Sequence, residues 1–192
     1  MAVVNKYGKE IPQGSKLKLF KKYTLHEKET LDLKLEGYDQ VAVFVIKGRL
    51  FVNCDGKETM MQTWQTPTDG IIFTGNEIKA TTYSFAGYWM DRCIFYVFYG
   101  DLKDARIGTF RVSRCDKDMV IDKQPYIKNT LFTARTCDYE QDWLLTEGHA
   151  SVRVGEDTVE LAAGDMLVIE PGVRHDFSDA HEYCEVICLK IK

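Results

Sequence analysis

The feature that most constrains the fold of this chain is a pair of short apolar stretches joined at a glycine, which occurs twice. Residues 41–52 read VAVFVIKGRLFV and residues 143–154 read WLLTEGHASVRV, and the two hinge glycines, Gly48 and Gly148, lie 100 residues apart. A short apolar stretch that stops at a glycine is typical of a β-strand. Each pair therefore predicts two strands joined by a tight turn.

The stretches that follow each pair come in the same order in both halves of the chain. In each half the chain continues with a glycine turn and then a polar strand. An acidic residue then begins an apolar run, and a closing strand follows. The strands expected outside the two pairs are residues 16–20, 30–35, 71–73, 94–99, 107–112, 158–161, 166–169 and 186–189. The repeated order favours an internal duplication. Because no longer stretch has a helical period, the sequence predicts an all-β chain.

A charged and mixed stretch separates the two halves at residues 101–129. Composition changes of this kind are typical of domain boundaries. We therefore predict one domain over residues 1–114 and a second over residues 115–192.

One segment of the second half, GDMLVIEPGVRHDFSD, places a histidine just after a turn. It resembles the second signature motif of the cupin superfamily, G-x5-P-x-G-x2-H-x3-N. Gly164, Gly172 and His175 fall at the family spacings, Pro171 comes one place late, and Asp179 stands in place of the usual asparagine. The first half resembles a cupin only by its pattern of strands.

The resemblance implies a fold of tandem double-stranded β-helix barrels, also called jelly rolls, which together form a bicupin. Such a barrel has two sheets packed face to face, with a small-molecule pocket between them at one end. In cupins the first motif, G-x5-H-x-H-x3,4-E-x6-G, and the histidine of the second motif hold one divalent metal ion.

The metal ligands that the resemblance implies are mostly replaced. Counted back from Gly148, the glutamate slot holds Gln141 and the two histidine slots hold Arg135 and Cys137, so that only His175 remains. Glutamine is a weak ligand, and a guanidinium repels a nearby cation. The expected cofactor is therefore either none or one divalent transition metal.

A weakened metal site stays open as an alternative. A gap of one residue would bring Glu140 or Asp138 inward, so that Cys137, Glu140 and His175 would hold the metal. In the first half, Lys79 falls about where His175 lies in the second, and no histidine occupies the corresponding slots. We expect no metal site there.

Arg135, Cys137 and Tyr139 alternate along one strand and therefore share a face. An inward face would bring a positive charge, a thiol and a phenol together with His175, which suits a carboxylate or phosphate ligand. The candidate substrate-binding residues are Arg135, Cys137, Gln141 and Trp143. In the alternative register Arg135 faces solvent, and Thr136 and Asp138 point inward. For Trp143, as for Trp64, Trp89, Tyr88 and Phe85, packing in the core or at an interface is the other interpretation.

Three functions fit these residues. The first is a module that binds a small, anionic molecule. The second is a metal-independent, sugar-type isomerase or epimerase, with His175 as the base and Tyr139 or Tyr183 as the acid. The third is a metal-dependent dioxygenase, isomerase or lyase. The sequence leaves open whether the protein is an enzyme.

Composition bears mainly on location and partners. The net charge is −4 and the 25 Lys and Arg residues are scattered, so neither a nucleic-acid nor a membrane partner is expected. Six cysteines form no CxxC pair, and the N-terminal residues contain no apolar signal segment, which predicts free thiols in the cytoplasm. Burial is expected for Cys93, Cys184 and Cys188, and exposure for His26, His149 and His181. A monomer and a homodimer both remain open.

Overall fold

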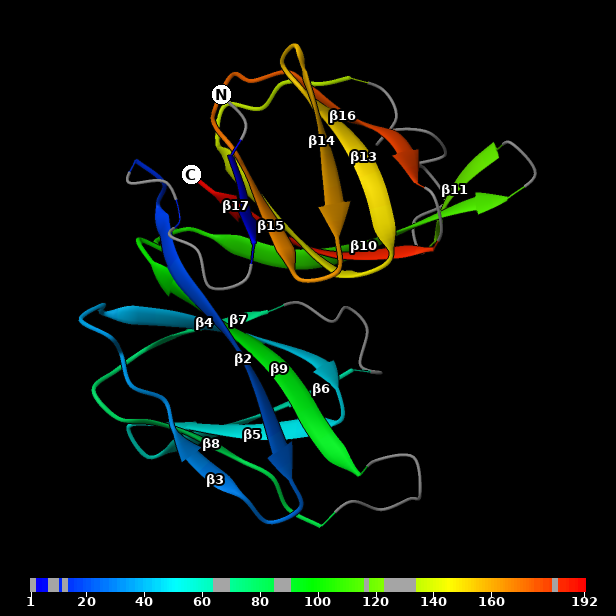
Figure 1. Ribbon diagram of the computed structural model, residues 1–192. Helices are drawn as coiled ribbons and strands as arrows, with labels where there is room; N and C mark the ends of the chain where they lie inside the picture. The colour runs from blue at the N-terminus through cyan, green and yellow to red at the C-terminus, as the bar shows by residue number, and fades with distance from the viewer. Residues whose placement is uncertain are drawn as a thin grey trace. The chain divides into compact units, whose positions relative to one another are not determined.

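The computed structural model describes residues 3–6, 11, 14–63, 70–84, 91–115, 118–122, 134–180 and 183–192. These residues form strands β1 to β17 and no helix, as the sequence predicts (Figure 1). No helix long and apolar enough to cross a membrane occurs among them. Every strand pair is antiparallel.

The chain divides into two compact units. The N-terminal unit is Lys16–Lys103, and the C-terminal unit combines Asp104–Lys192 with Met1–Ser15. This division differs from the predicted boundary at 114/115. The reason is that strand β10 (Arg106–Cys115) pairs over residues 106–112 with β17 (Cys184–Ile191), near the end of the chain. Pairing between such distant segments leaves no local signal in the sequence.

The N-terminal unit contains two four-stranded sheets, with orders β2-β9-β4-β7 and β3-β8-β5-β6 (Figure 1). Its strands are β2 (Leu17–His26), β3 (Thr30–Asp32), β4 (Gln40–Lys47), β5 (Arg49–Cys54), β6 (Lys57–Gln62), β7 (Ile71–Thr74), β8 (Ile78–Thr81) and β9 (Arg92–Gly100). The predicted strand pair at residues 41–52 thus becomes β4 and β5.

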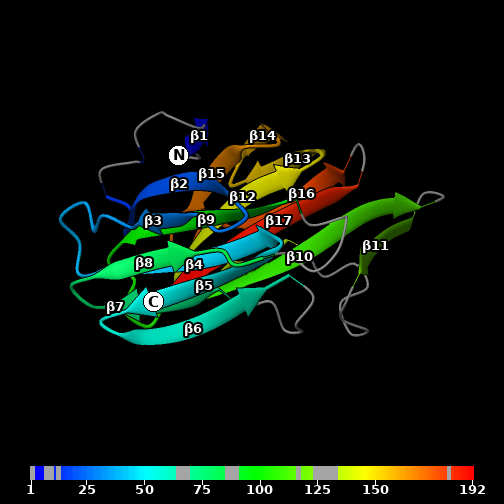
Figure 2. The ribbon, with the colours of Figure 1, turned by 90° about the horizontal axis from the view of Figure 1, so that it is seen from below.

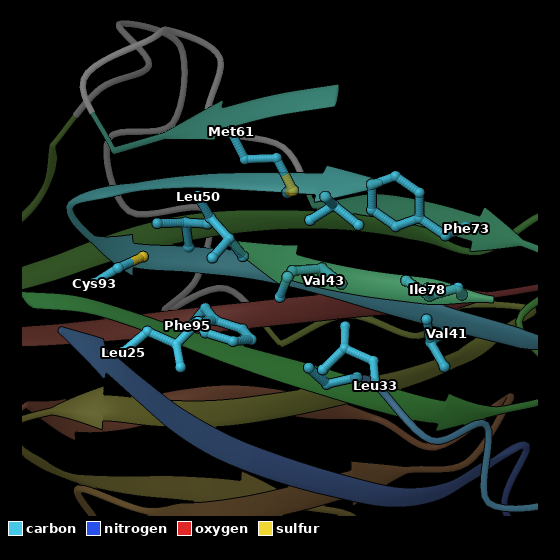
Figure 3. Close-up of a cluster of buried hydrophobic side chains, with 14 of the residues drawn as sticks. Leu25, Leu33, Val41, Val43, Leu50, Met61, Phe73, Ile78, Cys93 and Phe95 are labelled. Carbon is cyan, nitrogen blue, oxygen red and sulfur yellow. The ribbon is translucent and has the colours of Figure 1, made fainter. Parts of the chain in front are cut away.

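Apolar side chains fill the inside of the N-terminal unit. Alternate residues of β4 and β9, such as Val41, Val43 and Phe95, meet Leu50 and Ile78 from the other sheet (Figure 3). All five side chains are buried. The described part of this core therefore offers a ligand very few polar groups.

The C-terminal unit contains a six-stranded sheet of order β1-β15-β12-β17-β10-β11 and a three-stranded sheet of order β14-β13-β16. Its remaining strands are β1 (Val3–Lys6), β11 (Asp118–Asp122), β12 (Glu140–Glu147), β13 (His149–Val154), β14 (Asp157–Ala162), β15 (Asp165–Ile169) and β16 (His175–Ala180). Strands β10 and β11 form a hairpin (Figure 2). The apolar core of this unit lies between its two sheets.

Each unit turns from one sheet into the other at its hinge glycine. Gly48 joins β4 to β5 and Gly148 joins β12 to β13, with φ angles of +89° and +91°. A Cβ atom would also collide with backbone, that of Arg92 at Gly48 and that of Tyr183 at Gly148. Only glycine combines this φ with so close an approach. The glycines that mark the repeat in the sequence are therefore the points where the chain changes sheets.

Candidate functional site

His175 is the first residue of β16 and lies inside the C-terminal unit. A turn precedes it, in which the Val173 N–H donates to the Glu170 carbonyl at 3.2 Å. In the ladder His175 stands opposite Val154, a core residue, and its side chain is only 1% exposed. The histidine that the sequence places just after a turn is therefore directed into the barrel.

Two hydrogen bonds fix the tautomer of His175. Its Nδ1 lies 2.9 Å from the Val173 carbonyl oxygen, which only accepts, so Nδ1 carries the proton. Burial, with the charge of Arg135 adding to it, lowers the pKa of His175, although the Val173 bond and Asp176 oppose this shift. The ring is therefore neutral near pH 7, and Nε2 is an acceptor.

Gln141 completes this chain of hydrogen bonds. Its amide nitrogen lies 3.0 Å from His175 Nε2 and donates to it. The side chain is fully buried, and its Oε1 has no hydrogen-bond partner among the described residues. Buried polar atoms without a partner are rare in folded proteins, because each costs about 1–3 kcal/mol. Gln141 Oε1 is therefore a buried acceptor with which a donor group of a ligand could pair.

Trp143 lies two residues further along β12, on the same face. Its ring meets that of His175 edge-on, with 5.4 Å between the ring centroids, and stacks on Phe177 with 5.1 Å between the centroids. Its Nε1 forms no hydrogen bond of ordinary geometry within the described part of the chain. Across the ladder it faces Cys188, whose sulfur interacts with the indole but is a weak acceptor. A stronger acceptor inside the barrel would therefore satisfy this donor.

Arg135 lies directly opposite His175 on a neighbouring segment. The Arg135 N–H donates to the His175 carbonyl at 3.0 Å, and the His175 N–H donates back at 2.9 Å. Residues paired in this way place their side chains on the same face. Arg135 is half-buried, whereas Thr136 and Asp138 are exposed. The structure thus has the register in which Arg135 points inward.

Lys190 is a second cation at this end of the barrel, and the sequence analysis missed it. It stands opposite Gln141 in the β12–β17 ladder and so shares its face, although its side chain is exposed. Lys190 and Arg135 both lower the pKa of Cys188, which burial raises to about 12. The alternation Cys184, Val186, Cys188, Lys190 in β17 was the available signal.

Cys137 and Tyr139 lie in the segment between Arg135 and the start of β12. Both are half-buried, and the Gly172 N–H donates to the Cys137 carbonyl at 2.7 Å. Burial raises the pKa of Tyr139, and a hydrogen bond with the Cys137 thiol adds to this effect. Tyr139 is therefore protonated near pH 7 and carries no negative charge of its own.

The alternative metal set does not assemble. Glu140 is buried on the face opposite that of Gln141, where its carboxylate accepts a hydrogen bond from Ser15 Oγ at 2.8 Å. It cannot join Cys137 and His175, because neighbouring residues of a strand point to opposite faces. Among the described residues, no three His, Cys, Asp or Glu side chains come together to hold a metal ion. The prediction of a Cys137, Glu140 and His175 site is therefore corrected.

The predicted correspondence between Lys79 and His175 is wrong by one residue. In the β5–β8 ladder Cys54 pairs with Ile78, just as Val154 pairs with His175 in the β13–β16 ladder. Ile78 is therefore the counterpart of His175, and it belongs to the apolar core. Lys79 forms an ion pair with Glu77 instead.

The remaining candidate residues lie away from this face or outside the described residues. Tyr183 is 39% exposed and precedes β17, at the end of that strand opposite to Lys190. His26 is exposed, and His149 is partly exposed and contacts Glu160. Cys93, Cys184 and Cys188 are buried as predicted. His181, Trp64, Trp89, Tyr88 and Phe85 lie outside the described residues.

Comparisons with known proteins bear on the fold and on part of the C-terminal unit. Residues 129–189, about a third of the chain, match the family model of the AraC-like ligand binding domain. No curated protein matches the chain in sequence.

Three solved structures resemble the whole chain. AerE from Microcystis aeruginosa has a TM-score of 0.64 at 9% identity, over 97% of this chain and 98% of its own. A conserved protein of unknown function from Pseudomonas aeruginosa has a TM-score of 0.59 at 17% identity, over 94% and 84%. A variant of salicylate 1,2-dioxygenase from Pseudoaminobacter salicylatoxidans has a TM-score of 0.51 at 11% identity, over 90% and 70%. At these identities the likeness concerns the fold, and it confirms the resemblance to cupins.

Proposed function

We propose that the C-terminal unit binds a small oxyanion inside its β-barrel and does so without a metal ion. The observation that carries this proposal is the placement of Arg135 opposite His175, beside a buried and unpaired Gln141 Oε1. A charged group and an unused acceptor on one inner face indicate a bound polar molecule more than a packed core.

The chemistry of Arg135 favours a carboxylate or a phosphate as the charged group. A guanidinium presents a planar fork of donors that pairs with two oxygens at once. Partial burial strengthens such a pair, because the surroundings screen the charge less than water does. Lys190, exposed on the same face, adds a second positive charge that attracts the anion.

The donor set supports binding without the family metal. Gln141 and Cys137 stand where the family motif has glutamate and histidine, and Glu140 lies on the other face. The Arg135 guanidinium would repel a divalent cation held by His175. We infer that the guanidinium supplies the positive charge that a metal ion supplies in other cupins.

A metal-independent isomerase or epimerase is the second candidate function. Tyr139 favours it, since its phenol lies near Arg135 and Cys137 and carries a proton near pH 7, although the raised pKa makes it a weaker acid. His175 is less suited to the role of base, because the Val173 carbonyl and the Gln141 amide occupy both ring nitrogens. A substrate would first have to displace Gln141 from Nε2. If His175→Ala leaves a measured turnover unchanged, this candidate fails.

We further propose that the two units are tandem cupin barrels that arose by duplication. In the N-terminal unit β4 pairs with β7 and β9, and β5 pairs with β6 and β8. In the C-terminal unit β12 pairs with β15 and β17, and β13 pairs with β14 and β16.

Five cysteines of the described residues are free thiols, which supports a place in the reducing cytoplasm.

The proposal is tested by calorimetric titration of the wild type with small carboxylates and phosphates. Arg135→Gln should weaken binding of the best anion at least about tenfold, since hydrogen bonds to charged groups contribute about 1.5–3 kcal/mol. Arg174→Gln is the matched control, because Arg174 is exposed and directly precedes His175. Equal losses in the two variants, or none in either, would refute a site at Arg135.

A further inference from the structure

We infer that the oxyanion bound in the C-terminal barrel carries a hydroxyl group, which donates to Gln141 Oε1 while the charged group pairs with Arg135. This inference rests on the proposed function and names the class of its ligand. The class includes hydroxycarboxylates and hydroxylated phosphate esters. It is carried by the orientation of one amide and by the charges around it.

The orientation of the Gln141 amide follows from the hydrogen bonds of His175. The Val173 carbonyl requires a proton on Nδ1, so the Nε2 of the neutral ring requires a donor. The amide NH2 of Gln141 is the donor that lies there, at 3.0 Å. Gln141 Oε1 is therefore fixed as an acceptor, and turning the amide would break the bond to the ring. Only a ligand or a water that donates a proton can satisfy it.

A hydroxyl fits this acceptor better than an ammonium group. Arg135 is close enough to His175 and Cys188 to lower the pKa of both, so its positive potential extends across this face. An ammonium group of the ligand beside Gln141 would be repelled by Arg135, and Lys190 across the ladder adds to that repulsion. A hydroxyl donates without carrying charge, and its oxygen can also accept a hydrogen bond from Trp143 Nε1. One hydroxyl could thus satisfy two buried atoms that have no hydrogen-bond partner among the described residues.

The inference is tested with pairs of anions that differ by one hydroxyl. Lactate is compared with propionate, salicylate with benzoate, and glycerol 3-phosphate with propyl phosphate, by calorimetry on the wild type. We expect the hydroxylated member of at least one pair to bind about tenfold more tightly, the range expected when a buried acceptor is left unpaired. The carboxylate and phosphate pairs show which charged group the site prefers.

Gln141→Met removes the amide and keeps a side chain of similar length. It should abolish the preference for the hydroxyl and retain affinity for the anion without it. Gln62→Met is the matched control, since Gln62 belongs to the N-terminal unit and contacts Arg49 there. A preference that survives Gln141→Met would overturn the role assigned to this residue.

The wild-type comparison decides the matter even if the variant fails to fold. Equal affinity within every pair, together with loss of binding in Arg135→Gln, would overturn the inference and leave the proposed function standing. If no anion binds, or if Arg135→Gln binds as the wild type does, the proposed function fails and the inference fails with it.

Discussion

His175 shows at the scale of one residue how burial and neighbours set its chemistry. Its pKa is lowered from the ordinary value of 6.5, with burial as the main cause. A depressed pKa in the folded state means that the neutral ring stabilises the fold above pH 6.5. This contribution is lost as the pH falls through the folded-state pKa.

The first prediction concerns this pH dependence. As the pH falls from 7.5 to 5, the wild type should lose free energy of unfolding, measured in urea, relative to His175→Gln, because the variant has no ring to protonate at this position. His26→Gln, at an exposed histidine, should behave as the wild type does. The same slope in all three proteins would contradict the assignment.

Asp142 is a buried carboxyl group on the face of β12 that also carries Glu140. Its pKa is raised well above the ordinary value of 3.8, chiefly by burial and further by Glu140. A raised pKa means that the folded state favours the protonated acid. Its stabilising contribution is complete below pH 3.8 and is lost as the pH rises through the folded-state pKa.

Asp142→Asn should therefore stabilise the protein at neutral pH. The amide has the shape of the acid and carries no charge to bury, and it can donate to Glu140. Thermal unfolding at pH 7 should show a higher midpoint for Asp142→Asn than for the wild type, and the difference should shrink toward pH 4. Asp138→Asn, at an exposed position, should leave the midpoint unchanged. A lower midpoint for Asp142→Asn would contradict this account.

The hinge glycines are the critical positions at the scale of the strands. Gly148 has a φ of +91°, and a Cβ there would strike Tyr183 and Cys184. Gly155, in the turn between β13 and β14, has a φ of +65° and nothing within 4 Å of a Cβ. The two glycines share the left-handed backbone and differ in the space around them.

Alanine substitution at these two positions separates the two effects. Gly155→Ala should cost only the backbone strain, about 1–2 kcal/mol of unfolding free energy. Gly148→Ala adds a collision with backbone and should cost more than about 3 kcal/mol, or prevent folding. Denaturant titration of both variants measures the difference. Equal costs would mean that the backbone of Tyr183 does not lie as close to Gly148 as the structure shows.

Local patterns in the sequence predict the strands well, because alternation and glycine turns are local properties. The strands on either side of Gly48 and Gly148, and the start of β16 at His175, were all predicted from them. What depends on pairing between distant segments was not predicted. The partner of β10 and the one-residue offset between Ile78 and Lys79 are both set by ladders that no single segment encodes.

The candidate site was predictable to a similar degree. The sequence predicted one strand that carries Arg135, Cys137 and Tyr139 on one face, and a shift of one residue would have reversed every side chain. In the structure Arg135 forms an isolated bridge, and strand β12 begins only at Glu140. The bridge between Arg135 and His175 selects the register. Within β12, Gln141 faces His175, so its neighbour Glu140 lies on the other face, contrary to the metal set considered from the sequence.

At the scale of the whole molecule, the two units share a strand order and differ in their interiors. In the N-terminal unit Ile78 occupies the position that His175 has in the C-terminal unit. Val41, 100 residues before Gln141, is the residue that corresponds to it. Both Ile78 and Val41 belong to an apolar core. This difference supports the C-terminal unit as the place of the proposed ligand site.

The most direct test of this account is nitrogen-edited NMR of the indole N–H groups during titration with lactate. Trp143→Phe identifies the signal of Trp143, because it removes one indole N–H. The account predicts that this signal moves on titration and stays in place in Arg135→Gln. A ligand that shifts other signals and leaves that of Trp143 unmoved would place binding elsewhere and contradict the account.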